Sequence, residues 1–333
     1  MKVIEARGVG IDNLAIVERP EPKPGPREVL VKIRACSLNY RDLLILRGDY
    51  DPRQRFPLVM LCDGAGEVVE VGAEVTRVKR GDRVAAIFMQ RWISGNLTDE
   101  ATRSALGGGI DGVAAEYLTL HEDGLVHVPE HLSLEEAATL PCAAVTAWNA
   151  LFESGCVKFG DTVLTLGSGG VSVFALQFAR LAGARVIVTS SSDEKLERLK
   201  QLGGSDGVNY KRTPEWSECV HGVDHVIEVG GAGTFSQSLR AVRRGGTISL
   251  IGVLAGFGDV NPLLVLMKGV HVNGIYVGSR EMFERMNRAI AVAKLRPVID
   301  RVFSMDEIRE ALRYMESGSH FGKIVVRLAQ AHG

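Results

Sequence analysis

Apolar residues in the second half of the chain fall into short runs that alternate with amphipathic segments. The apolar runs at 162–167 and 184–190 predict buried strands, and the amphipathic segments at 170–182 and 192–202 predict the helices that follow them. Alternation of this kind favours an α/β domain in which a parallel sheet is doubly wound, with helices on both faces. The same pattern predicts further strands at 224–230, 246–253 and 271–278 and a further helix at 233–243.

The first 120 residues follow a different pattern, rich in glycine, proline and β-branched residues. Segment 20–38 is a proline-rich turn leading into an alternating strand, and segment 67–87 contains two or three short strands with glycine turns between them. Such closely punctuated strands favour an antiparallel, barrel-like unit. Residues 91–112 are polar and glycine-rich without a clear period, which predicts a long loop near a cleft. The last apolar run, 322–328, predicts a strand that returns to this first unit.

The composition excludes several classes of function. With 333 residues and a formal net charge of −1, the chain has room for two domains and lacks the basic face that nucleic-acid binding needs. Apolar runs such as 163–166 and 247–254 are too short for a membrane span, and the N-terminus lacks the apolar core of a signal peptide. We therefore expect a cytoplasmic protein that binds a small-molecule substrate, with neither nucleic acid nor a membrane as its partner.

The strongest local signal is the segment Leu166-Gly167-Ser168-Gly169-Gly170-Val171-Ser172, which lies between a predicted strand and a predicted helix. Backbone N–H groups at a helix start are unpaired, and the helix dipole places partial positive charge there. Glycines let the backbone turn tightly and approach phosphate oxygens. We therefore expect a dinucleotide diphosphate to bind here, with a ligand-free glycine turn as the alternative. The expected cofactor-binding residues of this loop are Gly167, Ser168, Gly169, Gly170 and Val171.

The end of the second predicted strand indicates which dinucleotide is bound. NAD-selective enzymes usually have an acidic residue about 20 positions after the glycine loop, where it accepts from the ribose 2′-hydroxyl. Here the hydroxyl residues Ser190 and Ser191 stand near that place, and Lys195 follows one turn into the next helix. Serines can donate to a 2′-phosphate and a lysine can neutralise it, which favours NADP(H). The alternative is that Ser192 caps the helix and Lys195 is an ordinary surface residue.

Beyond these signals, motifs along nearly the whole chain resemble the medium-chain dehydrogenase/reductase superfamily. Their order and spacing are most similar to its zinc-lacking, quinone-oxidoreductase-like branch, which includes sequences of the zinc-type alcohol dehydrogenase-like kind. The motifs are Asn39-Tyr40-Arg41-Asp42 with Arg47-Gly48-Asp49-Tyr50, Gly64-Ala65-Gly66-Glu67-Val68-Val69, Gly81-Asp82-Arg83-Val84, Thr146-Ala147-Trp148, the glycine loop, and Phe321-Gly322-Lys323.

The resemblance implies a two-domain fold. It assigns residues 1–125 and 295–333 to a GroES-like β-barrel catalytic domain and residues 126–294 to a Rossmann NAD(P)-binding domain. An active site is then expected in the cleft between the two. In the Rossmann domain, the strand that contains His271 is expected at the sheet edge, where a second copy of the chain could pair with it to form a homodimer.

The resemblance also bears on metal binding. Zinc-using relatives hold a catalytic ion through a Cys, a His and a second Cys, and this chain has Asn39, Cys62 and Cys142 at those positions. A catalytic zinc site needs three protein ligands, so we expect no metal, with a site made of Cys62, Cys142 and Asp63 as the alternative. No other cysteine or histidine spacing suggests a metal or a disulfide.

Candidate residues for the chemistry follow from the same resemblance. Tyr50 is the first candidate for a proton donor to the substrate, because related enoyl reductases have a functional tyrosine here. Asn39 is the second, as a neutral donor at the former metal position. The alternatives are that Tyr50 is a loop aromatic and that Asn39 caps a helix that ends at Gly48.

Further residues are expected to contact the ligands. Thr146 is expected beside the nicotinamide or, alternatively, as an interior helix contact. Turns after two predicted strands of the inserted domain could bind the carboxamide through backbone groups, because ligands bind at the carboxyl ends of parallel strands. These backbone positions are Gly252, Val277 and Gly278, and the expected substrate walls are Trp92, Leu254 and Phe257.

Three functions remain open from the sequence. The first is a zinc-independent, NADPH-dependent reductase of a quinone, an enone or another activated carbonyl or alkene. The second is an NAD(P)-dependent alcohol or aldehyde dehydrogenase. The third is an NADPH-binding structural protein of the crystallin type that carries out no turnover.

Overall fold

The computed structural model describes residues 1–256 and 258–328, and the chain divides into two compact units. One unit contains Met1–Ala143 with Gly278–Gly333, and the other contains Ala144–Val277. The second unit is shorter at both ends than the expected stretch 126–294, because the flanking elements pack in the first unit. Strand β8 (Leu125–His127) pairs with β6 (Arg83–Ala86), helix α3 (Leu134–Ala138) packs on β3 (Glu28–Ser37), and helix α9 (Arg280–Ala293) contacts β8.

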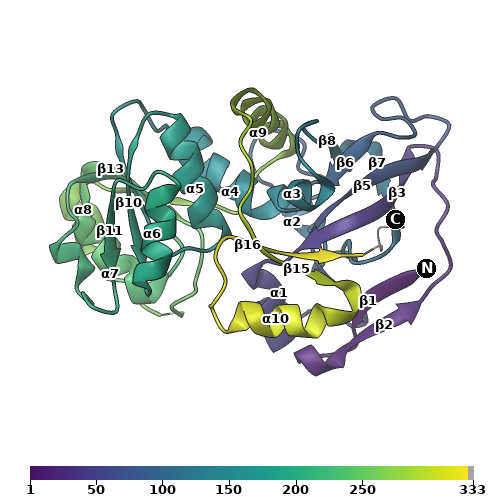
Figure 1. Cartoon of the computed structure of the whole chain (residues 1–333), viewed down its shortest axis with the longest axis horizontal. Coiled ribbons are helices and arrows are strands. Elements are labelled where there is room, and N and C mark those ends of the chain that lie inside the picture. The colour runs from purple at the N-terminus through teal and green to yellow at the C-terminus, as the bar shows by residue number, and fades with distance from the viewer. Residues whose placement is uncertain (257, 329–333) are drawn as a thin grey trace. The chain divides into compact units, whose positions relative to one another are not determined.

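The second unit is built on a six-stranded sheet with the order β11-β10-β9-β12-β13-β14, in which every neighbouring pair is parallel. Helices α5 and α6 follow β9 and β10, and helix α7 follows β12, so strands and helices alternate as predicted for an α/β domain with a parallel sheet (Figure 1). The elements are α4 (Val145–Trp148), β9 (Thr162–Thr165), α5 (Gly170–Leu181), β10 (Arg185–Ser190), α6 (Asp193–Gln201), β11 (Asp206–Asn209), β12 (Val223–Glu228), α7 (Ala232–Ala241), β13 (Val242–Leu250), α8 (Leu263–Lys268) and β14 (His271–Gly274).

Burial explains why the strands of this sheet are continuous apolar runs. Leu164 in β9, Val186 and Val188 in β10, and Ile227 in β12 are fully buried. A parallel sheet covered by helices on both faces excludes water from both sides, so successive residues of a strand are apolar. The strand order reverses beside β9, between β10 and β12, and ligands bind at such a switch point outside the carboxyl ends of the strands.

The first unit contains a seven-stranded sheet with the order β15-β16-β3-β5-β6-β8, to which β7 adds by pairing with β3, and a three-stranded sheet β2-β1-β4 (Figure 1). Strand β16 pairs with β3, which confirms that the last apolar run returns to the first unit. The strands are β1 (Lys2–Ala6), β2 (Leu14–Glu18), β3 (Glu28–Ser37), β4 (Leu58–Val59), β5 (Asp63–Val71), β6 (Arg83–Ala86), β7 (Tyr117–His121), β8 (Leu125–His127), β15 (Ile299–Ser304) and β16 (Lys323–Arg327). The helices are α1 (Tyr40–Arg47), α2 (Asp99–Arg103), α3 (Leu134–Ala138), α9 (Arg280–Ala293) and α10 (Ile308–Glu316).

The expected loop at 91–112 is partly wrong, because it contains α2. Thr98 caps this short helix by accepting from the backbone N–H of Ala101, and Asp99 and Glu100 stand in its first turn, where the helix dipole favours acidic residues. The helix is only five residues long, too short to show an apolar period in the sequence.

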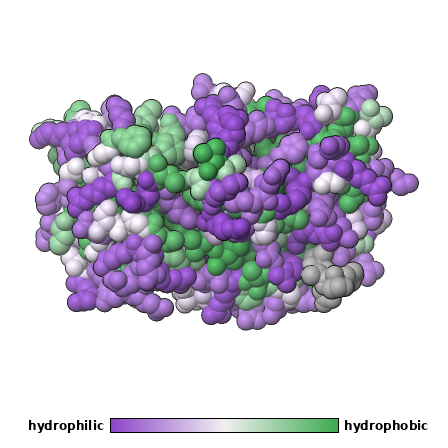
Figure 2. Space-filling model, turned by 45° about the horizontal axis from the view of Figure 1, so that its top comes forward, coloured by the Kyte–Doolittle hydropathy of each residue, from purple (hydrophilic) through white to green (hydrophobic). Residues whose placement is uncertain are grey.

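Polar side chains dominate the face of the molecule shown in Figure 2, and apolar residues form smaller patches among them. Within residues 1–256 and 258–328, none of the helices has the length and the apolar character needed to cross a bilayer.

Candidate functional site

The glycine loop connects β9 to α5 as expected. Gly167 adopts a φ of +74°, which favours glycine, and Gly169 is the N-cap of α5. A β-carbon added at Gly169 would meet no atom within 4 Å, so the backbone is open at that point. Since the first N–H groups of α5 have no partner inside the helix, the loop offers donors to an anion.

Ser172 stands where the usual fingerprint has its third glycine. Its side chain is buried, and its hydroxyl donates to the carbonyl of Leu166 at 2.6 Å. The serine therefore ties the first turn of α5 to the end of β9, and the close packing of helix and strand is kept without a glycine.

The carboxyl end of β10 carries the hydroxyl residues predicted to face the second ribose. Ser190 is the last residue of β10 and is buried, and Ser191 follows it. Ser192 caps α6, since its hydroxyl accepts from the N–H of Lys195 at 3.3 Å. The capping role considered for Ser192 is thus confirmed, and Lys195 stands in the first turn of α6.

Sequence reasoning missed a basic segment beside these serines. Strand β11 runs parallel to β10 with Asn209 opposite Ser190, so Tyr210, Lys211 and Arg212 leave the sheet at the same edge as Ser191. The signal was weak because β11, with the sequence DGVN, contains one apolar residue.

Two polar contacts link this basic segment to α6. Asn209 and Arg212 both donate to the carboxylate of Asp193, at 2.7 and 2.9 Å. These two hydrogen bonds lower the pKa of Asp193 below its usual value. Basic and acidic side chains therefore meet beside the end of β10.

The predicted backbone contacts lie after β13 and β14. A β-carbon at Gly252 would come within 2.4 Å of the Val229 carbonyl oxygen, so only glycine fits there. Val277 has a φ of +59°, a conformation rare for a β-branched residue, and its carbonyl accepts from Asn149 at 2.7 Å. Gly278 follows directly and belongs to the first unit. Strained backbone of this kind is found at functional positions.

The remaining candidates of the second unit are divided between surface and interior. Thr146 is buried within α4, as its alternative interpretation anticipated. Leu254 is half exposed in the turn after β13. Phe257 lies outside the described residues.

In the first unit, Asn39 is the N-cap of α1, and the helix ends at Gly48 in a left-handed conformation. The Asp42 carboxylate accepts from the backbone N–H of Asn39 at 2.8 Å. Burial raises the pKa of Asp42 to about 6 and outweighs this hydrogen bond, which by itself lowers the pKa. The capping role considered for Asn39 is therefore confirmed, and its side-chain amide has further partners outside the helix.

Those partners belong to a buried polar cluster around Lys323. Its ammonium group donates to the carbonyl of Leu38 and to Asn39 Oδ1, both at 2.7 Å, and to Asp63 Oδ2 at 3.3 Å. Ser37 donates to the same Asp63 oxygen at 2.8 Å. Lys323 and Asp63 are 3% and 0% exposed, so they form a buried ion pair. The sequence marked Lys323 only as part of a motif.

Two thiols adjoin this cluster. Ligand atoms of Cys62, Asp63 and Cys142 all lie within 4.8 Å of one another, and Asn39 Nδ2 is 3.5 Å from Cys62 Sγ. Burial raises the pKa of the Cys62 thiol well above its usual value, and the neighbouring Cys142 and Asp63 raise it further. Cys62 is buried and Cys142 is partly exposed.

Tyr50 is partly exposed and follows α1. Its ring centroid lies 4.7 Å from the guanidinium carbon of Arg41, which is also 4.8 Å from the ring of Phe88. Arg41 donates to the carbonyl of Leu106 at 2.8 Å, and a β-carbon at Gly108 would collide with its guanidinium. Arg41 thus connects α1 to the loop before β7 by a hydrogen bond and packs on the ring of Tyr50.

Trp92, a predicted substrate wall, is 5% exposed, and its indole N–H donates to the Gly95 carbonyl at 3.0 Å. Local packing accounts for these contacts, and the substrate role stays a prediction.

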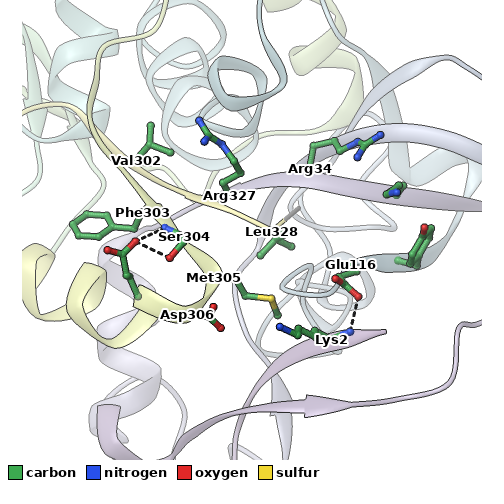
Figure 3. Close-up of a pocket in the computed structure, with 13 residues that line it drawn as sticks. Lys2, Arg34, Glu116, Val302, Phe303, Ser304, Met305, Asp306, Arg327 and Leu328 are labelled. Atoms are coloured by element: carbon green, nitrogen blue, oxygen red, sulfur yellow. Dashed lines mark hydrogen bonds between the residues drawn. The ribbon is translucent and has the colours of Figure 1, made fainter. Parts of the chain in front are cut away.

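A groove of about 880 Å³ opens in the first unit (Figure 3). Two of its charged side chains have polar partners: Arg34 pairs with Glu67 at 2.9 Å, and Glu307 accepts from Ser304 at 2.7 Å. The groove contains no residue expected to take part in the reaction. Its lining includes Lys2, Lys32, Arg34, Glu116, Ser304 and Arg327.

Comparison with known proteins matches both units. Residues 25–130 match the family described as alcohol dehydrogenase GroES-like domain, and residues 170–292 match that described as zinc-binding dehydrogenase. A zinc-type alcohol dehydrogenase-like protein of Schizosaccharomyces pombe is 47% identical, with 96% of each chain covered. A solved structure from Sinorhizobium meliloti, described as an alcohol dehydrogenase, is 40% identical with a TM-score of 0.92, covering 98% of each chain. The 2-octenoyl-CoA carboxylase reductase CinF, solved with NADP and 2-octenoyl-CoA, is 26% identical with a TM-score of 0.90, covering 100% of this chain and 88% of CinF.

Proposed function

The chain belongs to the medium-chain dehydrogenase/reductase superfamily of nicotinamide-dependent oxidoreductases, and from this premise we propose that it is a zinc-independent, NADPH-dependent reductase. Its substrate is a quinone, an enone or another activated carbonyl or alkene. The observation that carries this proposal is the buried Lys323–Asn39–Asp63 cluster, which contains Asn39 at the position that the resemblance gives to the first zinc ligand.

Asp63 and Asn39 disfavour a zinc ion at that position. Asp63 Oδ2 already accepts from Ser37 and from Lys323, and the ammonium group lies 3.3 Å from this oxygen. A divalent cation on Asp63 would meet this fixed positive charge in a buried place, where charge repulsion is strong. The side-chain NH2 group of Asn39 faces the sulfur of Cys62. An amide NH2 group donates hydrogen bonds and is not a metal ligand.

NADPH is the proposed coenzyme. Strand β10 ends in hydroxyl residues, Ser190 and then Ser191, and Arg212 follows the neighbouring strand β11. The first acidic residue after β10, Asp193, is already bonded to Arg212 and Asn209. Hydroxyl and guanidinium groups suit a 2′-phosphate, whereas a carboxylate would suit the free 2′-hydroxyl of NADH. The NADP bound to the related CinF is consistent with this assignment.

In the proposed reaction the bound nicotinamide supplies a hydride to the acceptor. The chain's own residues must then stabilise the negative charge that develops on the acceptor oxygen. We assign this role to the phenol of Tyr50 and the side-chain amide of Asn39, both of which are partly exposed. Tyr50 can also deliver a proton, because a phenol donates as well as accepts.

The enzyme is proposed to act as a homodimer through the free side of β14. In the described part of the second unit, β14 is the last strand of the sheet and pairs only with β13. The preceding helix α8 exposes Leu266 and Met267 by 78% and 60%, and Val272 in β14 is 37% exposed. Apolar groups around an unpaired strand edge favour pairing with a second copy.

An alcohol or aldehyde dehydrogenase with a bound metal is the second candidate. Cys62, Asp63 and Cys142 place two thiols and one carboxylate within 4.8 Å of one another, and catalytic zinc sites use three protein ligands. The third candidate, a coenzyme-binding structural protein, predicts binding without turnover.

One experiment separates the three functions. NADPH oxidation is followed against quinones, enones, aldehydes and ketones, with NADH in parallel, on enzyme whose metal content has been measured. The proposal expects turnover of quinones or enones with NADPH that a chelator does not reduce. Stoichiometric zinc with loss of activity on chelation overturns it in favour of the dehydrogenase, and coenzyme binding without any turnover favours the structural protein.

A further inference from the structure

Lys323 is the first residue of strand β16 and is buried, and the proposed reaction does not use it directly. Its ammonium group has three N–H donors and meets three acceptors, on Leu38, Asn39 and Asp63. Because every donor is occupied and the side chain is 3% exposed, Lys323 has no N–H left for a substrate. Its effect must therefore pass through the groups that it binds.

The contact with Asn39 determines which way the amide points. A lysine ammonium can only donate, so the Asn39 atom at 2.7 Å must be the oxygen. The amide nitrogen then lies on the other side, 3.5 Å from Cys62 Sγ. With the opposite orientation, a carbonyl oxygen would stand where the proposed reaction needs an N–H group.

We propose that Lys323 is a positioning residue that fixes the Asn39 side chain with its NH2 group directed toward the Cys62 side of the site. The proposal rests on the proposed function, in which that NH2 group donates to the acceptor oxygen. The backbone N–H of Asn39 is held by Asp42, and the capping box of α1 also directs the side-chain oxygen toward the helix; Lys323 adds a donor at 2.7 Å to that oxygen. Fixing a donor before the reaction avoids the cost of reorienting it while charge develops.

The competing explanation is that Lys323 only neutralises Asp63. Removing one member of a buried ion pair leaves an uncompensated charge and destabilises a fold. A lysine variant alone could therefore fail to fold for a reason unrelated to Asn39. The test must remove both charges together and compare the result with removal of the Asp63 charge alone.

The kinetic experiment compares Asp63→Asn, Asp63→Asn/Lys323→Met and Asn39→Ala. We expect the double variant to lose about tenfold or more in kcat relative to Asp63→Asn, with KM for NADPH unchanged, because a donor to the reacting oxygen is misplaced. In an Asn39→Ala background, the double variant should lose less than about twofold in kcat relative to Asp63→Asn. The reason is that the effects of residues that act as a unit are not additive. Equal losses in both backgrounds would overturn the positioning role.

Lys268→Met is the matched control. Lys268 also donates to three acceptors, the backbone carbonyls of Leu239, Arg240 and Val242, but it is the last residue of α8 and belongs to the second unit. Its loss should lower thermal stability without a selective loss of kcat. A kcat loss as large as that of the Lys323 variant would show that the readout reports general damage.

A second measurement does not depend on turnover. The side-chain NH2 resonances of Asn39 are identified in ¹⁵N-asparagine-labelled protein by their loss in Asn39→Ala. They should move in Asp63→Asn/Lys323→Met far more than in Asp63→Asn alone, and unchanged resonances overturn the proposal. If the wild-type enzyme reduces no acceptor, the proposed function fails while this spectrum still decides whether Lys323 orients the amide.

Discussion

Arg212 lies 2.9 Å from the carboxylate of Asp193, and both side chains are largely exposed, by 74% and 61%. An ion pair in contact with water contributes little free energy, because the solvent screens it and both side chains lose conformational freedom. Arg212 can therefore leave Asp193 for a doubly charged 2′-phosphate at modest cost. Under the proposed function, this pair supplies the second ribose of NADPH with a cation near the end of β11.

Arg212→Ala should raise KM for NADPH about tenfold and leave KM for NADH nearly unchanged, since a phosphate contact is worth about 1–2 kcal/mol. The two constants are measured with the same acceptor. Arg185→Ala is the control, because Arg185 forms a similarly exposed pair with Asp206 on the same sheet at 2.5 Å. Equal effects on the two coenzymes, or a wild-type preference for NADH, would contradict the assignment of NADPH.

Gly169→Asp should weaken binding of NADPH and of NADH alike. The site has room for the new side chain, because nothing lies within 4 Å of a β-carbon at Gly169, so the fold is retained. A carboxylate at the start of α5 would repel the diphosphate, and we expect a loss of about tenfold or more in affinity by calorimetry. Gly169→Asn has nearly the same shape without the charge and should lose much less. Equal losses of affinity in Gly169→Asp and Gly169→Asn would contradict a charge effect, and would mean that the diphosphate binds elsewhere or that the bulk of the new side chain blocks it.

The sequence predicted the second unit well because its strands and its glycine loop are specified by residues that are neighbours in the chain. Residues 163–165 are fully buried, two of the three are apolar, and the glycine loop follows them directly in the chain. The missed strand β11 has one apolar residue, so its position depends on pairing with β10 and not on its own pattern. The Lys323 cluster was equally inaccessible, because it joins side chains that are 260 and 284 positions apart.

Tyr50→Phe should lower kcat about tenfold to a hundredfold while leaving KM for NADPH unchanged, because it removes one donor to the developing oxyanion and keeps the ring that packs on Arg41. Steady-state rates with the best acceptor measure the effect. Tyr117→Phe, a change of the same kind on β7, should retain full activity. Full activity of Tyr50→Phe would remove the phenol from the mechanism.

A charge on the free edge of the second unit should separate two copies of the chain. Leu266→Asp and Val272→Asp place a carboxylate on α8 and β14, and burying it in an interface is costly. Light scattering during gel filtration should change from the mass of two chains to that of one. Val292→Asp in α9, at a side chain that is 87% exposed in the first unit, should remain dimeric. A wild-type monomer would refute the edge-strand dimer.

Glu122 should make the stability of the first unit depend on pH. Its carboxylate is fully buried, and although burial raises its pKa, the backbone N–H groups of Thr76 and Arg77 and the Arg27 side chain outweigh this and lower the pKa to about 2. A carboxyl whose pKa is lower in the folded state than in the unfolded state stabilises the fold above the unfolded value. The contribution, about 2–3 kcal/mol, is therefore complete above roughly pH 4.5 and is lost as the pH falls toward 2.

Glu122→Gln should accordingly lower the free energy of unfolding by about 2–3 kcal/mol at pH 7, because the neutral amide replaces a carboxylate that accepts from two backbone N–H groups and an arginine. Urea denaturation at a series of pH values should show the gap between variant and wild type narrowing as the pH falls from 4.5 toward 3. Glu197→Gln removes an exposed carboxylate that pairs with Lys200 at 2.7 Å, and it should change stability little at any pH. A gap for Glu122→Gln that stays constant across this range would mean that the lost stability comes from packing, and that the ionised carboxylate is not what holds Thr76 and Arg77 in place.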